Sequence, residues 1–178
     1  KARHTLSEDA LLQHFQLGEE RTFEQDPKYA LRLVVDIAVK ALSPAINDPT
    51  TAVQALDQIE DLLLRLGRLS LEDGTFHDRA GRARLRMPCP AWEDFLRLAL
   101  DEICAYGADS VQVMRRMNAL IRNLLGVLPA TRHAALRHWD RRIQSSIARA
   151  FDNPEEQQEA RVADRQGLGI GEEPASEP

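Results

Sequence analysis

The sequence contains only two cysteines, Cys89 and Cys104, and they follow no metal-binding or redox spacing. A chain of 178 residues can bury a core of its own, so it needs no disulfide framework. Long apolar runs are missing too. The longest, residues 29–42, has fourteen residues interrupted by three charges, whereas a spanning helix needs about 20. These absences exclude a disulfide-rich fold and a spanning segment in this chain, and they fit a reducing compartment.

Basic residues are not in excess either, because the formal net charge is −5. From Asp152 onward there are eight acidic and two basic residues, so this part carries −6 and the rest +1. A nucleic-acid-binding protein needs a basic stripe that neutralises phosphates, so no nucleic-acid partner is expected. Two local arginine clusters, within 79–86 and 132–149, could face an acidic partner or water. Charge runs usually mark a solvated face, which is the interpretation we favour.

Catalytic and metal-binding patterns are also lacking. Ser43 has neither the glycine pattern nor the strand–turn–helix context of a nucleophile elbow. No histidine forms an i,i+4 pair or stands beside a cysteine at ligand spacing; the five are His4, His14, His77, His133 and His138. We therefore assign no catalytic residue, metal or cofactor, and the sequence leans against an enzyme.

Helix start and stop signals fill most of the chain. Asp26 and Asp48 each precede a proline and open a helix, because aspartate caps free amides and proline loses nothing at the first helical position. Pro44 ends the first of these helices, since it disfavours helical geometry in the residue before it. Together with apolar periodicity, these signals predict helices over 8–17, 27–43, 49–66, 91–106, 110–128 and 131–151, and an exposed helix from 154 to about 165.

These elements predict an all-α fold, a bundle of about six helices in one domain over residues 1–166. Turn signals and flanking prolines predict a small β-hairpin insertion at about 75–87. Residues 167–178 have almost nothing to bury and are expected to be a disordered tail. The helix over 27–43 is apolar on nearly all faces, so we expect it to be the most buried.

Apolar residues on the outer faces of two helices bear on association. Val53 and Leu64 fall opposite the core stripe of the helix beginning at 49, and Leu98 is similarly placed on the helix over 91–106. Some apolar surface should therefore remain uncovered in a lone chain. We expect a homo-oligomer.

The helix over 27–43 also carries the first candidate site. Lys28, Arg32, Asp36 and Lys40 recur every four residues and form a polar stripe, of which the last three are the site candidates. If exposed, they form two i,i+4 pairs worth about 0.2–0.5 kcal/mol each. If buried, they need partners, because an unpaired buried charge is costly. We favour a structural network in a buried or interfacial setting, and a ligand site or signalling interface stays open.

The second candidate lies in the stretch ALSPAINDPTTA, residues 41–52, where Asn47, Asp48, Thr50 and Thr51 gather at a helix start. Free amides at such a start attract anions. Asp48, however, is itself the expected cap and would repel a phosphate. We favour a structural corner over a small-ligand or ion site.

Four stretches resemble a known family: LGEERTFEQDP, LRLVVDIAVKALSPAINDPTTAVQALDQI, HDRAGRARLRMP and DEICAYGADSVQVMRRM. Over about residues 17–125 the chain is similar to the soluble C-terminal region of a family of predicted bacterial membrane proteins, domain of unknown function 2254. The resemblance implies that a membrane-spanning N-terminal part, absent here, precedes this domain. It also implies a place at the inner (cell) membrane, with this domain in the cytoplasm. It implies no reaction.

Two functions follow from these observations. The first is a regulatory or assembly domain of a bacterial integral membrane protein, channel- or transporter-like, whose partners are its own transmembrane region and further copies. The alternative is a small-ligand-binding or enzymatic domain with its site in the helix–corner–helix at 32–51. The chain opens on Lys1 rather than Met, so we expect a piece of a longer protein. An enzyme needs a pocket with convergent polar groups, whereas an assembly domain needs an apolar patch; we favour the latter.

Overall fold

The computed structural model describes residues 26–71 and 74–168, with a few isolated residues before 26. Over residues 26–168 it contains six helices and one two-stranded antiparallel sheet, which confirms the predicted all-α bundle with a hairpin. The helix predicted over 8–17 lies for the most part outside the described residues. The helices are α2 (Pro27–Ala41), α3 (Pro49–Arg68), α4 (Trp92–Tyr106), α5 (Val111–Val127), α6 (Ala130–Ala150) and α7 (Pro154–Arg161).

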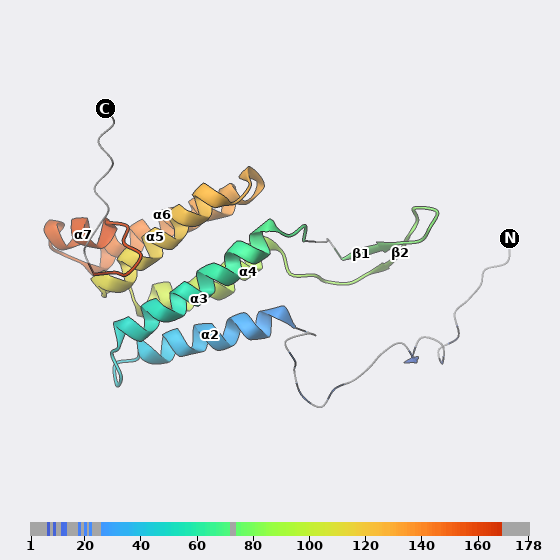
Figure 1. Cartoon of the computed structure of the whole chain (residues 1–178), viewed down its shortest axis with the longest axis horizontal. Coiled ribbons are helices and arrows are strands. Elements are labelled where there is room, and N and C mark those ends of the chain that lie inside the picture. The colour runs from blue at the N-terminus through green and yellow to red at the C-terminus, as the bar shows by residue number, and fades with distance from the viewer. Residues whose placement is uncertain are drawn as a thin grey trace.

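The helices stack in tiers (Figure 1). α2 packs across α3 and α4; α3 then packs against α5, and α4 against α6. α7 lies on the far side, against α5 and α6. The tiers are therefore α2, then α3 with α4, then α5 with α6, and finally α7. Each of the two middle tiers is covered from both sides, whereas α2 is covered from one side by the described part of the chain.

The two aspartate caps form as predicted. An oxygen of Asp26 accepts a hydrogen bond from the Lys28 amide at 3.0 Å, and an oxygen of Asp48 accepts from the Thr51 amide at 3.1 Å. Between them the chain turns at Asn47, whose φ of 47° is left-handed, a conformation that asparagine tolerates better than most residues. The stretch 41–52 is thus a helix–corner–helix.

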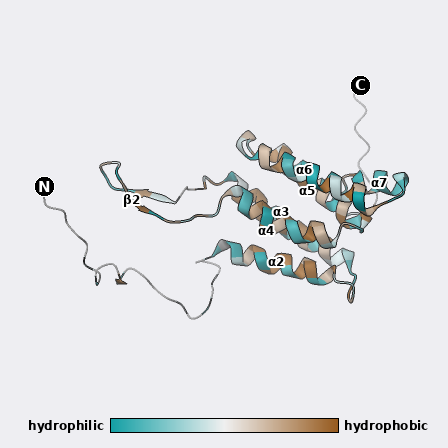
Figure 2. Ribbon diagram, turned by 180° about the vertical axis from the view of Figure 1, so that it is seen from behind, coloured by the Kyte–Doolittle hydropathy of each residue, from teal (hydrophilic) through white to brown (hydrophobic). Residues whose placement is uncertain are grey.

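The expectation that the helix over 27–43 is the most buried was wrong. α5 holds nine buried residues, whereas α2 holds four, Leu31, Val35, Ala38 and Ala41. Leu33 and Ile37 on α2 are 38% and 54% exposed. α2 is apolar nearly all round, but its outer tier offers only one packed face. In Figure 2 brown and teal alternate along its ribbon, as expected for a helix with apolar residues on more than one face.

The positions expected to leave apolar surface were also wrong. Val53 is buried, and Leu64 and Leu98 are half-buried against the core. The faces opposite the main core stripes of α3 and α4 are covered by neighbouring elements. Exposed apolar side chains lie at other positions, among them Leu33 and Ile37 on α2 and three residues of the hairpin.

In the C-terminal part the helix is shorter than predicted, and more of the chain is buried than predicted. α7 ends at Arg161 rather than near 165, and Ala160 is fully buried beneath it. Residues 162–168, here called the C-terminal strap, run back over α5. A Cβ at Gly167 would lie 2.5 Å from Gln112 Cγ, so the strap approaches α5 closely. The predicted disordered tail lies outside the described residues from 169 onward, and Gly167, expected to belong to it, is buried.

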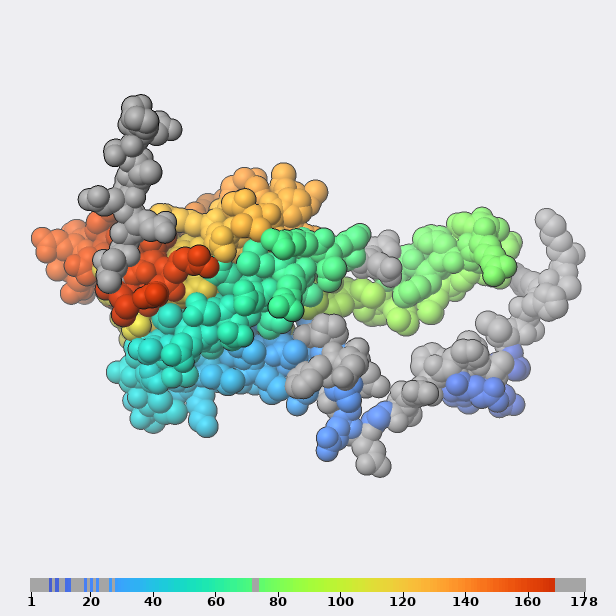
Figure 3. All heavy atoms as spheres, viewed as in Figure 1, coloured from blue at the N-terminus to red at the C-terminus, as the bar shows by residue number. Residues whose placement is uncertain are grey.

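The hairpin consists of β1 (Thr75–His77) and β2 (Ala83–Arg86). Phe76 pairs with Leu85, and an irregularity in the register follows between Phe76 and His77. The hairpin projects from the helices as a narrow finger (Figure 3).

Candidate functional site

Arg32, the first of the sequence candidates, sits in a surface ion network. Its guanidinium donates to both oxygens of Glu102 on α4, at 3.1 Å from Nη2 to Oε2, and contacts Asp36 Oδ1 at 2.6 Å. The side chains of Arg32, Asp36 and Glu102 are 38%, 48% and 42% exposed. The stripe is therefore solvated, which corrects the buried setting favoured from sequence. Of its two possible i,i+4 pairs, Arg32–Asp36 forms, whereas Lys40 makes no ion pair with a described residue.

Electrostatics in this network follow the hydrogen bonds. The bond to Glu102, and after it the bond to Asp36, raises the pKa of Arg32 above its ordinary range. In turn, the bond from Arg32 lowers the pKa of the Glu102 carboxyl. Both groups are held charged, so the network ties α2 to α4 by an ion pair.

The corner residues form a separate group. Asp48 accepts hydrogen bonds from the hydroxyl and the amide of Thr51, and these bonds, with a smaller one from the Thr50 amide, lower the pKa of Asp48. Asn47 supplies the turn. Arg32 lies nine positions before Ala41, the end of α2, which is about 14 Å of rise, so the structure does not bring Arg32 to the corner. Asp48 is confirmed as a cap; a binding role for the corner stays a prediction.

A third polar group, which the sequence candidates did not include, is buried between α3 and α5. Arg116 on α5, with a side chain 3% exposed, donates from Nε to Asp57 Oδ1 at 2.8 Å and from Nη2 to Glu60. The Glu60 side chain is 5% exposed and also accepts from Asn123 Nδ2. This chain of bonds ties the middle of α5 to α3.

One nitrogen of this cluster has no hydrogen-bond partner among the described residues. Arg116 Nη1 is buried and makes no hydrogen bond with a described residue. A buried donor without an acceptor is costly, so such a group signals a water or a ligand oxygen at that place. The cluster borders a hollow of about 360 Å³ lined by Asp57, Glu60, Asp61, Leu64, Arg116, Arg165 and Gln166.

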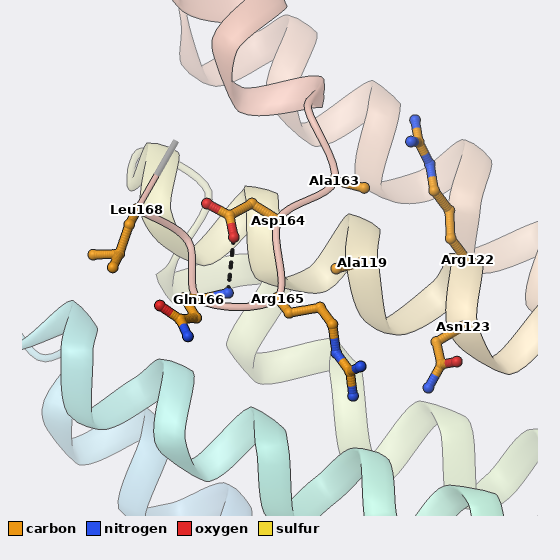
Figure 4. A pocket seen from close by; sticks show the side chains of 8 residues that line it. All are labelled: Ala119, Arg122, Asn123, Ala163, Asp164, Arg165, Gln166 and Leu168. Carbon is orange, nitrogen blue, oxygen red and sulfur yellow. Dashed lines mark hydrogen bonds between the residues drawn. The ribbon is translucent and has the colours of Figure 1, made fainter. Parts of the chain in front are cut away.

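The C-terminal strap separates this hollow from a larger one of about 580 Å³, lined by Ala119, Arg122, Asn123, Ala163, Asp164, Arg165, Gln166 and Leu168. In Figure 4 the side chains of Arg165 and Asn123 extend toward α3, whereas Arg122 extends the opposite way. The strap is fastened to α5 by the bond from the Asp164 amide to the Arg115 carbonyl at 3.3 Å. Within the strap, the Asp164 side chain accepts from the Gln166 amide at 2.9 Å.

The polar groups that line the two hollows suit recognition of a polar ligand. The described lining residues offer guanidinium, carboxylate and amide groups. Within 26–71 and 74–168, no three His, Cys, Asp or Glu side chains are placed to hold a metal ion.

Sequence reasoning missed this cluster because its members are spread over two helices. Two signals were present: Glu60 lies next to Ile59 in the apolar stripe of α3, and Arg116 lies between Met114 and Met117 on α5. A charge inside an apolar stripe needs a partner, so each predicts the other. Their contact, across 56 residues of sequence, required the tertiary structure.

Comparison with known proteins identifies the family of this chain but indicates no activity. A family described as "Predicted membrane protein (DUF2254)" matches residues 2–123. Uncharacterized proteins of Mycobacterium tuberculosis and Mycobacterium bovis are 36% identical over 110 residues, which is 62% of this chain and 21% of theirs. The chain thus spans about a fifth of the length of these curated relatives. No solved structure matches it.

The family description, a predicted membrane protein, can be compared with the helices of this chain. None of the described helices has the length and apolar character needed to cross a bilayer. The match nevertheless covers more than half of the chain, including α2, the corner, α3 and the hairpin. The chain belongs to the DUF2254 family of predicted membrane proteins.

Proposed function

We propose that this chain is an assembly and regulatory domain of a bacterial integral membrane protein, carried outside the bilayer, and that it associates with further copies of itself. The observation that carries the proposal is the outer face of α2, where Leu33 and Ile37 are exposed one turn apart. Leu31, Val35 and Ala38 supply the core on the other side of α2, so this apolar face lies outside the core and is available to a partner. The role of the whole protein as a channel or transporter stays a prediction.

Charge supports a second copy as the partner on this face. Beside Leu33 and Ile37 lie Asp36 and Lys40, one of each sign, both exposed. Two α2 helices running antiparallel about a two-fold axis would bring Leu33 of one copy to Ile37 of the other. Each Asp36 would then lie within reach of a cation of the partner. Such a self-complementary patch suits an isologous dimer.

The cysteines support a cytoplasmic position for the domain. Cys89 is exposed and Cys104 is buried, and both are free thiols. Free exposed thiols persist in a reducing compartment and tend to oxidise outside it. The proposed domain therefore faces the cytoplasm.

Sedimentation of the 178-residue chain, and of the full-length protein in detergent, tests the proposal. We expect an oligomer that Leu33→Gln together with Ile37→Gln dissociates. Val127→Gln, which changes an apolar residue 45% exposed at the end of α5, is the matched control and should leave the oligomer intact. A strict monomer in both forms of the protein would contradict the proposal.

A second candidate function is binding of a small polar ligand at the strap hollows. The unpartnered Nη1 of Arg116 favours it, because this donor faces no acceptor among the described residues. This candidate moves the ligand-site alternative from the 32–51 corner to α3, α5 and the strap. Native mass spectrometry of the full-length protein should then show a co-purified small molecule, which Arg165→Ala releases. A bare protein mass in both wild type and variant would reject it.

A further inference from the structure

We propose that the β-hairpin is a membrane-contact element, which lays its apolar face into the headgroup region of an anionic bilayer and holds lipid phosphates with its arginines. The inference goes beyond the assembly role proposed above and uses none of the α2 residues. It rests on charge, on the register of the strands and on exposure.

The charge of the hairpin stands apart from the rest of the chain. Residues 74–90 carry four arginines and one acid, a net charge of +3, whereas the remaining residues carry −8. The acid, Asp78, contacts Arg82 at 3.1 Å and Arg84 at 3.4 Å. Arg79 and Arg86 make no ion pair with a described residue. Guanidinium groups bind phosphate oxygens in pairs, which suits them to lipid headgroups.

The register of the strands makes the hairpin amphipathic. Phe76 and Leu85 are cross-strand partners and therefore share a face. Met87 follows two positions after Leu85, and its amide continues the ladder with a 2.8 Å bond to the Gly74 carbonyl, so it joins that face. The three side chains are 41%, 52% and 43% exposed. Arg86, which pairs with Thr75, alternates with them and lies on the opposite face.

Contacts within the hairpin shape its backbone. Gly74 and Gly81 both have φ above 70°, and a Cβ at Gly74 would collide with the Met87 carbonyl oxygen. Asp78 Oδ1 accepts from the amides of Ala80 and Arg82 at 2.9 and 3.1 Å, which shapes the turn. These contacts define the backbone geometry of the turn and of the entry to the hairpin.

Nevertheless, the described residues leave the finger uncovered. All residues from 79 to 89 are exposed, and the finger extends past the ends of the helices (Figures 1 and 3). A two-stranded hairpin without a covered face is marginal in water, so a surface that accepts it would stabilise it. A convex finger needs a groove in a protein partner, whereas a headgroup layer adapts to it. Membership in a membrane-protein family puts a bilayer within reach.

Vesicle flotation of the 178-residue chain tests the inference. We expect binding to vesicles of equal parts phosphatidylcholine and phosphatidylglycerol, weakening as salt rises, and little binding to phosphatidylcholine alone. Phe76→Ser, Leu85→Ser and Met87→Ser together should lower the partition coefficient about tenfold or more. Arg79→Gln with Arg86→Gln should lower it about tenfold or more as well.

Controls separate this result from general charge and from misfolding. Arg137→Gln with Arg141→Gln removes two exposed arginines of α6 and should leave binding unchanged. Helical circular dichroism should be equal in all variants, because the hairpin lies outside the bundle. In addition, Phe76→Trp should give a blue-shifted emission on adding the anionic vesicles.

Two outcomes would overturn the inference. One is vesicle binding that persists in both hairpin variants. The other is a wild-type chain that ignores anionic vesicles but loses self-association when the hairpin is changed, which would make the hairpin a protein contact. Since the assembly proposal is tested on Leu33 and Ile37, failure of one proposal is distinguishable from failure of the other.

Discussion

Two arginine–carboxylate networks tie helices together in this domain, and they differ mainly in how far their side chains are exposed to solvent. Arg116 on α5 is 3% exposed and bonds Asp57 and Glu60 on α3, whereas Arg32 on α2 is 38% exposed and bonds Asp36 and Glu102. The chemistry of the pairs is alike. Their expected contributions to the free energy of unfolding differ, because water screens an exposed pair and hydrates its ions when the pair breaks.

The difference shows which network is committed to the fold. Glu60 is 5% exposed, so its charge depends on Arg116 and Asn123 for compensation. Asp36 and Glu102 are each more than 40% exposed and would be hydrated without Arg32. Hence the buried network constrains how α3 meets α5, and the exposed one leaves α2 available for a partner.

The largest expected effect is from Arg116→Met. This change leaves Glu60 buried without a cation, so the free energy of unfolding should fall by about 3–5 kcal/mol. Chemical denaturation, with the slope compared between variants, measures it. Arg122→Met, an exposed arginine on the same helix, should stay within about 0.5 kcal/mol of wild type.

A second variant tests whether the loss of stability comes from the unpaired charge of Glu60. Combining Arg116→Met with Glu60→Leu replaces the buried pair by apolar groups and should recover part of the loss, because Glu60 no longer needs a cation. If Arg116→Met alone costs under about 1 kcal/mol, water from the neighbouring hollow already hydrates the cluster, and the contrast between the two networks collapses.

An intermediate effect is expected from Asp48→Ala, where a half-buried carboxylate bonds backbone amides rather than an ion. Loss of the cap frees the Thr51 amide and should lower the midpoint of thermal unfolding by about 2–4 °C. Asp48→Asn should retain most of the stability, since asparagine also caps. An unchanged or raised midpoint in ligand-free buffer would instead indicate a charge held for binding and revive the corner as a site.

The corner and the caps could be predicted from sequence because they depend on residues a few positions apart. Asp26 and Asp48 bond the amide of a residue two or three positions on, and Pro44 acts on its neighbour. The hairpin was predicted for the same reason, since Gly74 and Gly81 supply its positive φ angles. Local signals therefore located most elements to within a few residues.

Burial could not be predicted as well, because it depends on how the tiers stack. The apolar pattern of α2 fits a central helix, yet α2 lies in the outer tier and α5 takes the centre. The partner of Arg32 was missed for the same reason, since Glu102 lies 70 residues away on α4. Of the candidate site, the sequence found the Arg32–Asp36 pair and the corner cap, but neither Glu102 nor the Arg116 cluster.

The smallest expected effect is from the exposed network itself, tested by Glu102→Gln. An exposed pair contributes about 0.2–1 kcal/mol, and the hydrogen bond from Arg32 lowers the pKa of Glu102 below its ordinary value of 4.5. A lowered folded-state pKa means that the contribution is present above pH 4.5 and is lost as pH falls through the lowered value. The difference between wild type and Glu102→Gln, measured by denaturation at several pH values, should therefore shrink in acid and also at about 1 M salt. A difference that stays constant with both pH and salt would mean that Glu102 acts by packing, and α2 would then be fixed to α4 as firmly as α5 is to α3.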